Sequence, residues 1–338
     1  VRIKYKITFA VWKPNNDFKS SLNMLTRRHI RVKVMQCIYA LVQSKDDSLQ
    51  KQEKFLRVSI ENMYVLYLLI LSLLAELHRL AEKHVSHSSK KYVATEEDKY
   101  PNPEKFIKNR LLLQLVNNQA LKDELSKRKL DNWYLNDEYV KIIHKAMISS
   151  DIYKEYMSTA DGSYAEDRDM VIQLFKEIIA PNEKIYDYFE DDKLTWVDDF
   201  PIVNTFLVKR LKKARPDSGD RFFLPALLKD QQDMDFANQL LTKTLLNDAK
   251  WEKEIEGKTP NWDNDRIAEI DSIVLKMAIC ELLNFPSIPV IVTLNEYLEI
   301  AKEYSTPKSS IFINGVLDKL AKEYKADGRL QKIGRGLQ

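Results

Sequence analysis

Glycine occurs only seven times in the 338 residues of this chain, and proline only eleven times. Sheets of short strands need a turn every few residues, and those turns draw heavily on both residue types. Loops that cradle phosphates likewise need closely spaced glycines. The sequence therefore predicts an all-α fold without a glycine-rich nucleotide site.

The apolar content argues for a folded chain that stays out of membranes. Hydrophobic residues make up 44% of the sequence and charged residues 30%, which is ordinary for a globular protein. The longest apolar run, residues 63–75, is shorter than the roughly 20 residues of a membrane span, so it predicts a buried helix. Cys37 and Cys280 lie far apart within apolar patterns, so neither a disulfide framework nor a zinc ribbon is expected. This use of cysteine predicts a cytoplasmic location.

Basic residues are concentrated at the start of the chain. The whole chain has a net charge of +3, yet residues 1–45 hold ten Lys or Arg and a single acid, Asp17. The remainder is therefore net acidic, which favours protein over RNA as a partner for most of the chain. Residues 1–23 show no periodicity and Met24 directly precedes the first patterned helix, so we expect 1–23 to be a non-native or disordered extension.

Residues 24–45 contain no acid and predict a basic helix. Apolar residues recur on one helical face, and four cations gather at the amino end: Arg27, Arg28, Arg31 and Lys33. A helix amino terminus already carries positive partial charge, so cations there are disfavoured unless an anion compensates them. Two interpretations remain open at this point, a solvated basic face and a contact with phosphates.

The later helices are marked by start signals. One long helix, or two, is expected over 48–84, followed by a polar loop that begins around Ser86 and His87. His84 and His87, at this helix end, are interpreted as solvated rather than as metal ligands. Thr293 and Glu296 have the spacing of a capping box, and Thr306-Pro307 opens the last helix. Weak matches at an offset of 66 residues, such as Gln173-Leu174 with Gln239-Leu240 and Trp196 with Trp262, suggest a degenerate duplication.

No constellation of catalytic residues is apparent. The acidic stretch Glu190-Asp191-Asp192 lacks a neighbouring Lys or His base and is read as a structural loop. There is no nucleophile elbow and no Ser, His and Asp order that helices would bring together. We therefore expect no enzyme activity, no cofactor and no metal.

Two separated parts of the chain resemble the NusB family of transcription antitermination factors. The first is the arginine-rich helix, whose apolar stripe ends near Tyr39. The second comprises four linked motifs in the family's order: residues 270–282, Ile288-Pro289, residues 294–302 and residues 312–318. Four linked motifs are far more specific than a lone basic helix.

The resemblance implies a pair of helical bundles enlarged by a long helical insertion. The core would comprise residues 24–45 and 232–325, the insertion residues 46–231, and residues 326–338 a flexible tail. The insertion is rich in large apolar side chains, so it is expected to be packed rather than loose.

The resemblance also implies a function. Family members pair with the ribosomal protein NusE and capture single-stranded boxA RNA during rRNA transcription, within the RNA polymerase antitermination complex. The matching RNA-binding residues here are Arg27, Arg28, Arg31, Lys33, Lys308, Ser309 and Phe312. Phe312 is a candidate stacking platform for a base, although a core role is equally compatible with its apolar neighbours. Tyr39 and Asp271 are the matching partner-binding residues.

Two other classes of function stay open. One is a helical protein-interaction scaffold in which the insertion is the working part. The other is an RNA-binding module linked to rRNA maturation or modification, since similar domains occur fused to rRNA methyltransferases. A methyltransferase needs a cofactor domain with a glycine-rich turn and a catalytic cysteine, and the sequence indicates neither.

Overall fold

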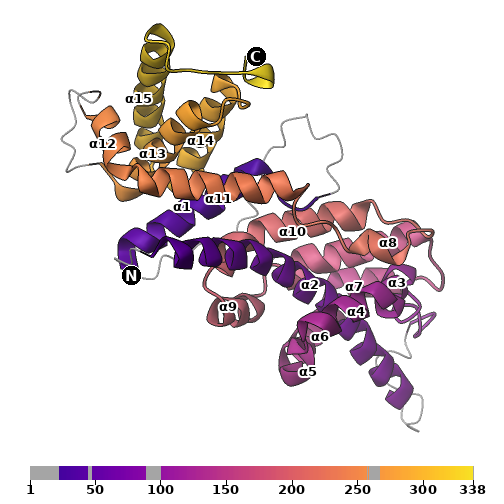
Figure 1. Cartoon of the computed structure of the whole chain (residues 1–338). Helices are drawn as coiled ribbons and strands as arrows, with labels where there is room; N and C mark the ends of the chain where they lie inside the picture. The colour runs from indigo at the N-terminus through magenta and orange to yellow at the C-terminus, as the bar shows by residue number, and fades with distance from the viewer. Residues whose placement is uncertain (1–22, 45–47, 89–99, 257, 259–266, 338) are drawn as a thin grey trace. The chain divides into compact units, whose positions relative to one another are not determined.

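The computed structural model describes residues 23–44, 48–88, 100–256, 258 and 267–337, and within them the fold is all-α (Figure 1). The only β-type pairing in these ranges is an isolated parallel bridge between Asn23 and Ala226. The expected all-α class is confirmed. The predicted extension 1–23 lies almost entirely outside the described residues, as do Trp262 and Lys45.

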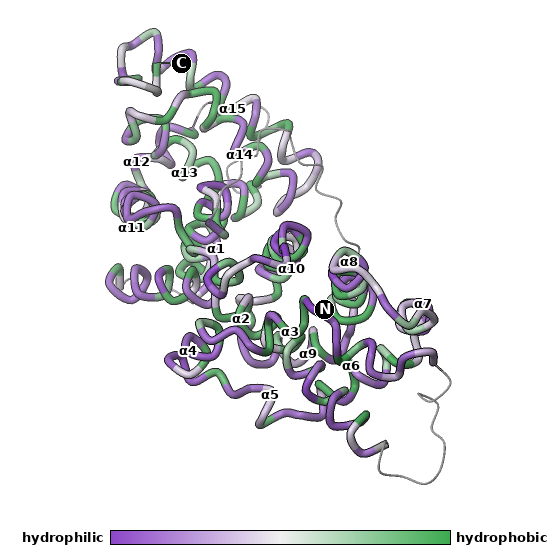
Figure 2. Tube along the Cα trace, turned by 90° about the vertical axis from the view of Figure 1, so that its right-hand side faces the viewer, coloured by the Kyte–Doolittle hydropathy of each residue, from purple (hydrophilic) through white to green (hydrophobic). Residues whose placement is uncertain are grey.

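The chain divides into two compact units. Unit 1 contains residues 61–226 together with the segment before Leu25, and unit 2 contains residues 25–60 and 227–338. Both units use helix α2 (Leu49–Ser88), which passes the boundary at residue 60. The tube in Figure 2 shows apolar and polar residues interspersed along the helices of both units, as amphipathic helices require.

Unit 2 is built around the first helix of the chain. Its helices besides the start of α2 are α1 (Arg27–Ser44), α11 (Gln231–Leu246), α12 (Asp248–Ile255), α13 (Glu269–Asn284), α14 (Val290–Tyr304) and α15 (Pro307–Ala326), with a final turn η5 (Gly334–Leu337). Helix α1 packs against α11, α13 and α14. The apolar stripe of α1 is buried, with Ile30 and Val34 fully covered. Burial of that stripe brings the basic amino end of α1 against three other helices.

Unit 1 has its own core. It is formed by the rest of α2 with α3 (Arg110–Asn117), α4 (Gln119–Arg128), α5 (Asn132–Leu135), α6 (Asp137–Ser149), α7 (Asp151–Met157), α8 (Tyr164–Leu174), the π-helical turn η2 (Phe175–Ile179), α9 (Glu183–Asp192), α10 (Trp196–Lys212) and the 3-10 turn η3 (Asp220–Phe223). Trp133 and Trp196 are buried, and their indole N–H groups donate to the carbonyls of Leu69 and Asn62 in α2. Aromatic side chains thus join α5 and α10 to α2.

The segment expected as one or two helices over 48–84 is a single helix. Its apolar stretch is long enough to cross a membrane by composition, but 72% of that stretch is buried by the rest of the chain, as in a core helix. His84 lies in α2 as expected, whereas His87, predicted in the polar loop, belongs to the last turn of the helix, so that part of the prediction is wrong. His84 instead stacks on His144 of α6, with 4.7 Å between ring centroids.

Two predicted helix starts need correction. Thr293 does not cap a helix, because α14 begins earlier, directly after Pro289, and Thr293 lies buried within its first turn. A true capping box exists at Ser163, whose hydroxyl accepts from the Glu166 amide while the Glu166 carboxylate accepts from the Ser163 amide. The last helix begins as predicted, with Thr306 as the capping residue and Pro307 in the first turn.

Candidate nucleic-acid interface

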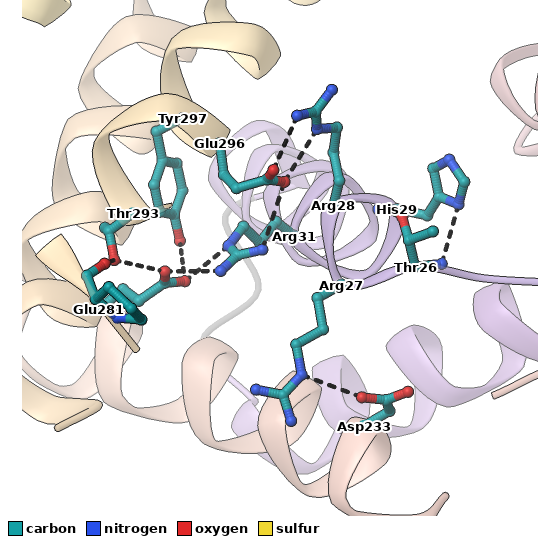
Figure 3. A network of polar contacts seen from close by, with 11 residues as sticks. Thr26, Arg27, Arg28, His29, Arg31, Asp233, Glu281, Thr293, Glu296 and Tyr297 are labelled. Carbon is teal, nitrogen blue, oxygen red and sulfur yellow. Dashed lines mark hydrogen bonds and ion pairs between the residues drawn. The ribbon is translucent and has the colours of Figure 1, made fainter. Parts of the chain in front are cut away.

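The first turn of α1 is fixed by a reciprocal cap. The Thr26 hydroxyl accepts from the His29 amide at 3.5 Å, and the His29 Nδ1 accepts from the Thr26 amide at 3.2 Å. His29 thus fills the position that Glu or Gln holds in a capping box. Figure 3 shows the arginines that this turn presents, each close to a carboxylate of another helix.

Arg28 forms a two-point ion pair with Glu296 of α14. Its Nε and one terminal nitrogen donate to the two carboxylate oxygens at 2.9 and 2.8 Å. The hydrogen bond to Glu296 raises the pKa of Arg28, so the guanidinium stays charged. The side chain remains 25% exposed, which leaves part of the guanidinium on the surface.

Arg27 is the most exposed of the three arginines, at 41% of its side chain. Its Nε donates to Asp233 of α11 at 3.2 Å, and the guanidinium lies 4.9 Å from the ring centroid of Phe236. A cation over an aromatic face is held in a defined direction without using all of its donors. Arg27 therefore keeps donors available to an outside anion.

Arg31 lies in the interior, where it is 2% exposed. It donates to both carboxylate oxygens of Glu281 in α13, at 2.8 and 2.7 Å. The remaining lone pairs of Glu281 accept from the hydroxyls of Thr293 and Tyr297, at 2.9 and 3.3 Å (Figure 3). Burial acts to lower the pKa of Arg31, but the charge and hydrogen bonds of Glu281 outweigh it and raise the pKa. Burial raises the pKa of Tyr297 well above its usual value, so Tyr297 is a neutral donor.

The other predicted RNA-binding residues fall into two groups. Lys33 is buried in α1, so like Arg31 it is turned away from the surface. Lys308 is exposed in the first turn of α15, Phe312 is half-buried one turn later, and Ser309 is buried. The amide of Ser309 donates to the Thr306 hydroxyl at 3.2 Å, so Ser309 is part of the helix cap.

The two predicted partner-binding residues differ in accessibility. Tyr39 is 40% exposed on α1, whereas Asp271 is 3% exposed on α13 and accepts a 2.5 Å hydrogen bond from Ser305. A cavity of about 620 Å³ opens between α1, α11, α12 and α13, and Ile38, the residue before Tyr39, is among those that line it. Apolar side chains line it, among them Ile38, Leu41, Val42, Leu245 and Ile273, with Asp248, Glu252 and Lys276 also present.

The described residues hold no cluster of three or more His, Cys, Asp or Glu side chains that suits a metal ion. Both cysteines are free and buried. Burial raises the pKa of Cys37 to about 12 and that of Cys280 to about 11, which keeps both thiols protonated and unreactive near neutral pH.

The sequence did not indicate the acidic partners of the arginines. Asp233, Glu281 and Glu296 come from three helices that lie more than 200 residues further along the chain. A signal for one of them existed, because Glu281 is an acid inside the apolar stripe of α13. A buried acid in such a position requires a cation or hydrogen-bond donors.

Comparison with known proteins covers the carboxy-terminal part of the chain. The model of the NusB family matches residues 207–322. Over 109 residues the chain is 44% identical to a transcription antitermination protein NusB of Salinibacter ruber, a match spanning 32% of this chain and 68% of that protein. This chain belongs to the NusB family.

Other NusB proteins match in the same way. The NusB of Chloroherpeton thalassium is 36% identical over 38% of this chain and 61% of its own length, and that of Geotalea uraniireducens is 35% identical over 35% and 78%. No solved structure matches the chain. The matches confirm the resemblance inferred from the sequence and support a role in transcription antitermination. They cover about a third of the chain.

Proposed function

We propose that this NusB-family chain binds boxA-type single-stranded RNA through the first turn of α1 and pairs with NusE in the RNA polymerase antitermination complex. The observation that carries the proposal is the pair of surface arginines, Arg27 and Arg28, held in fixed directions by Asp233 and Glu296. Fixed guanidinium groups suit the two-point recognition of phosphate oxygens. Lys308 and Phe312 at the start of α15 are proposed to add a phosphate contact and a base-stacking surface.

Arg31 and Lys33 have a different part in this proposal. Because both are buried, they do not reach a phosphate in this conformation. Arg31 instead joins α1 to α13 through Glu281 and lies 3.6 Å from Glu296, the partner of Arg28. Its proposed contribution to RNA binding is to hold α1 and the Glu296 carboxylate in place.

The RNA contact is tested by replacing Arg27 and Arg28 with alanine in the full chain. Each lost charge-assisted contact should weaken binding of a short boxA-type RNA about tenfold, and the two together should reduce the salt slope by about 1.4. Lys54 and Arg57, also exposed in unit 2, provide the control. Equal RNA affinity of the Arg27→Ala/Arg28→Ala and Lys54→Ala/Arg57→Ala variants would refute this part of the proposal.

The NusE contact is proposed for the face around Tyr39 and the neighbouring cavity. Exposed tyrosines beside an apolar pocket are frequent anchors of protein interfaces. Tyr39→Ala should weaken NusE binding by about thirtyfold, measured by titration calorimetry, which corresponds to about 2 kcal/mol. Tyr134 of unit 1 is exposed and unrelated to this face, so Tyr134→Ala is the matched control. Failure of the unaltered chain to bind NusE, with or without RNA, would favour the scaffold function instead.

A further inference from the structure

The carboxyl end of α10 and the turn after it carry a second group of cations, in unit 1. Residues 205–215 include no acid. Lys212, Lys213, Arg215 and Arg221 are all exposed, and we call these four residues the α10 basic surface. The opposite face of the helix is apolar, with Leu207 and Leu211 fully buried. Lys212 and Lys213 therefore lie at the exposed end of α10, Arg215 lies in the turn that follows, and Arg221 lies in η3.

The charges of these four head groups are not compensated by carboxylates within the described residues. Within the described ranges, none of the four makes an ion pair, whereas Arg110, Arg128 and Lys141 of the same unit each have a carboxylate partner. Asp217 is exposed in the turn, but Asp220 is engaged elsewhere, accepting from the first amides of α4 at 2.8 and 3.4 Å. The interaction of lysines with the carboxyl end of a helix dipole offsets only part of this charge.

The backbone beneath the α10 basic surface is held in place. The Gln114 side chain donates to the carbonyls of Arg215 and Pro216, both at 3.0 Å. Arg210 lies 4.3 Å from the ring centroid of Phe222 and donates to the Phe222 carbonyl, so η3 and Arg221 stay against the end of α10. The Tyr67 hydroxyl donates to the Phe223 carbonyl at 2.8 Å. A backbone that is already held in place loses less conformational entropy when the cations on it bind an anion.

We propose that the α10 basic surface binds the phosphate backbone of single-stranded RNA, as a contact separate from that of the α1 arginines. Four exposed, unpaired cations between the end of α10 and η3 are complementary to a polyanion. Arg210 lies over one face of the neighbouring Phe222 ring, and no base-stacking role is assigned to that ring. Contact with the backbone alone does not read sequence, and binding here should be independent of base composition.

The acidic average of the chain after residue 45 predicted protein partners for the insertion. The average does not show the local excess of positive charge at the α10 basic surface. Acids of unit 1 are concentrated elsewhere, as in Glu190, Asp191 and Asp192 at the end of α9. The inference rests on the proposed function only in that RNA is the ligand, and it does not depend on Arg27 or Arg28.

The test uses the full chain with Arg27→Ala and Arg28→Ala, so that the first contact is removed. An unstructured uridine RNA of about 30 nucleotides, longer than one basic groove covers, is the probe. This background should retain salt-sensitive binding. Adding Lys212→Gln, Lys213→Gln, Arg215→Gln and Arg221→Gln should remove that binding, and in the otherwise unaltered chain the same four changes should lower the salt slope by about 3.

A matched variant neutralises four other exposed lysines of unit 1: Lys83, Lys145, Lys176 and Lys184. It should bind as the background does. If the fourfold Gln variant loses its helical signal, the two pairs, Lys212 with Lys213 and Arg215 with Arg221, are neutralised separately, and each should remove about half of the slope change. Absence of binding by the background, or equal loss in the matched variant, would overturn the inference. Failure of the proposed function has a different signature, because it requires boxA binding to be insensitive to Arg27 and Arg28.

Discussion

The buried ion pair of Arg31 and Glu281 is the feature of unit 2 whose disruption should lower the stability of the protein most. Both side chains are almost fully removed from water, and every oxygen of Glu281 has a partner. An ion pair in this setting contributes little net stability when intact, because desolvation offsets attraction. Removing one partner is costly, since the other charge stays buried without compensation.

Glu281→Ala should therefore lower the free energy of unfolding by about 3–5 kcal/mol, measured by urea denaturation. Glu299 of α14 is 43% exposed at its side chain and forms an ion pair with Lys302, so Glu299→Ala should change stability by no more than about 0.5 kcal/mol. If the two variants were equally stable, a group other than Glu281 would have to stabilise the buried charge of Arg31.

At the scale of elements, sequence reasoning succeeded where the determinants are local. The apolar stripe of α1 and the Thr306-Pro307 start of α15 are properties of adjacent residues, and both helices form as expected. It failed at Thr293, because the spacing to Glu296 matched a cap while the true partner, Glu281, belongs to the preceding helix. It also assigned Arg31 to the surface, because a helical period does not show that a distant carboxylate will receive a buried guanidinium.

The contact between α2 and α6 in unit 1 should make stability depend on pH. Burial and the stacked His84 lower the pKa of His144 to about 4, below the 6.5 of an unfolded histidine. Above pH 6.5 His144 is neutral in both states and has no effect. As the pH falls from 6.5 to 4 only the unfolded chain binds the proton, so unfolding becomes easier by up to about 2 kcal/mol after allowance for solvent screening.

Denaturant unfolding at pH 7.0 and pH 4.5 measures this effect, with His144→Gln as the comparison because Gln does not titrate. The variant should lose less stability than the unaltered chain between these two pH values. The exposed His87 serves as the control, and His87→Gln should leave the pH dependence unchanged. An identical pH dependence in His144→Gln would show that other groups cause it.

At the scale of the whole molecule, each unit has its own buried aromatic and aliphatic core. Trp133 and Trp196 belong to unit 1, and Trp251 belongs to unit 2. Units with separate cores commonly unfold in separate steps, so a single two-state transition is not expected. Calorimetry should resolve two unfolding transitions, and Glu281→Ala should lower the midpoint temperature of only one of them.

Trp133→Ala should lower the midpoint temperature of the other transition, because it removes a buried indole and its hydrogen bond to Leu69 from unit 1. The free energy of unfolding of unit 1 should fall by about 3–5 kcal/mol. If either substitution shifted both transitions equally, α2 would couple the two units into one cooperative structure.

The division of the chain also sets an order of events on the ribosome. Apart from the segment before Leu25, unit 1 is a continuous stretch from residue 61 to 226, whereas unit 2 needs residues 25–60 and the last third of the chain. At about 5–20 residues per second, α1 leaves the ribosome roughly ten seconds or more before Glu281 has been made. During that interval the helices that bury Arg31 and Lys33 in the folded protein are incomplete, so these two side chains stay in water. Unit 1 can therefore complete its core first. Helix α13 is made later, and only then can Glu281 pair with Arg31 of α1.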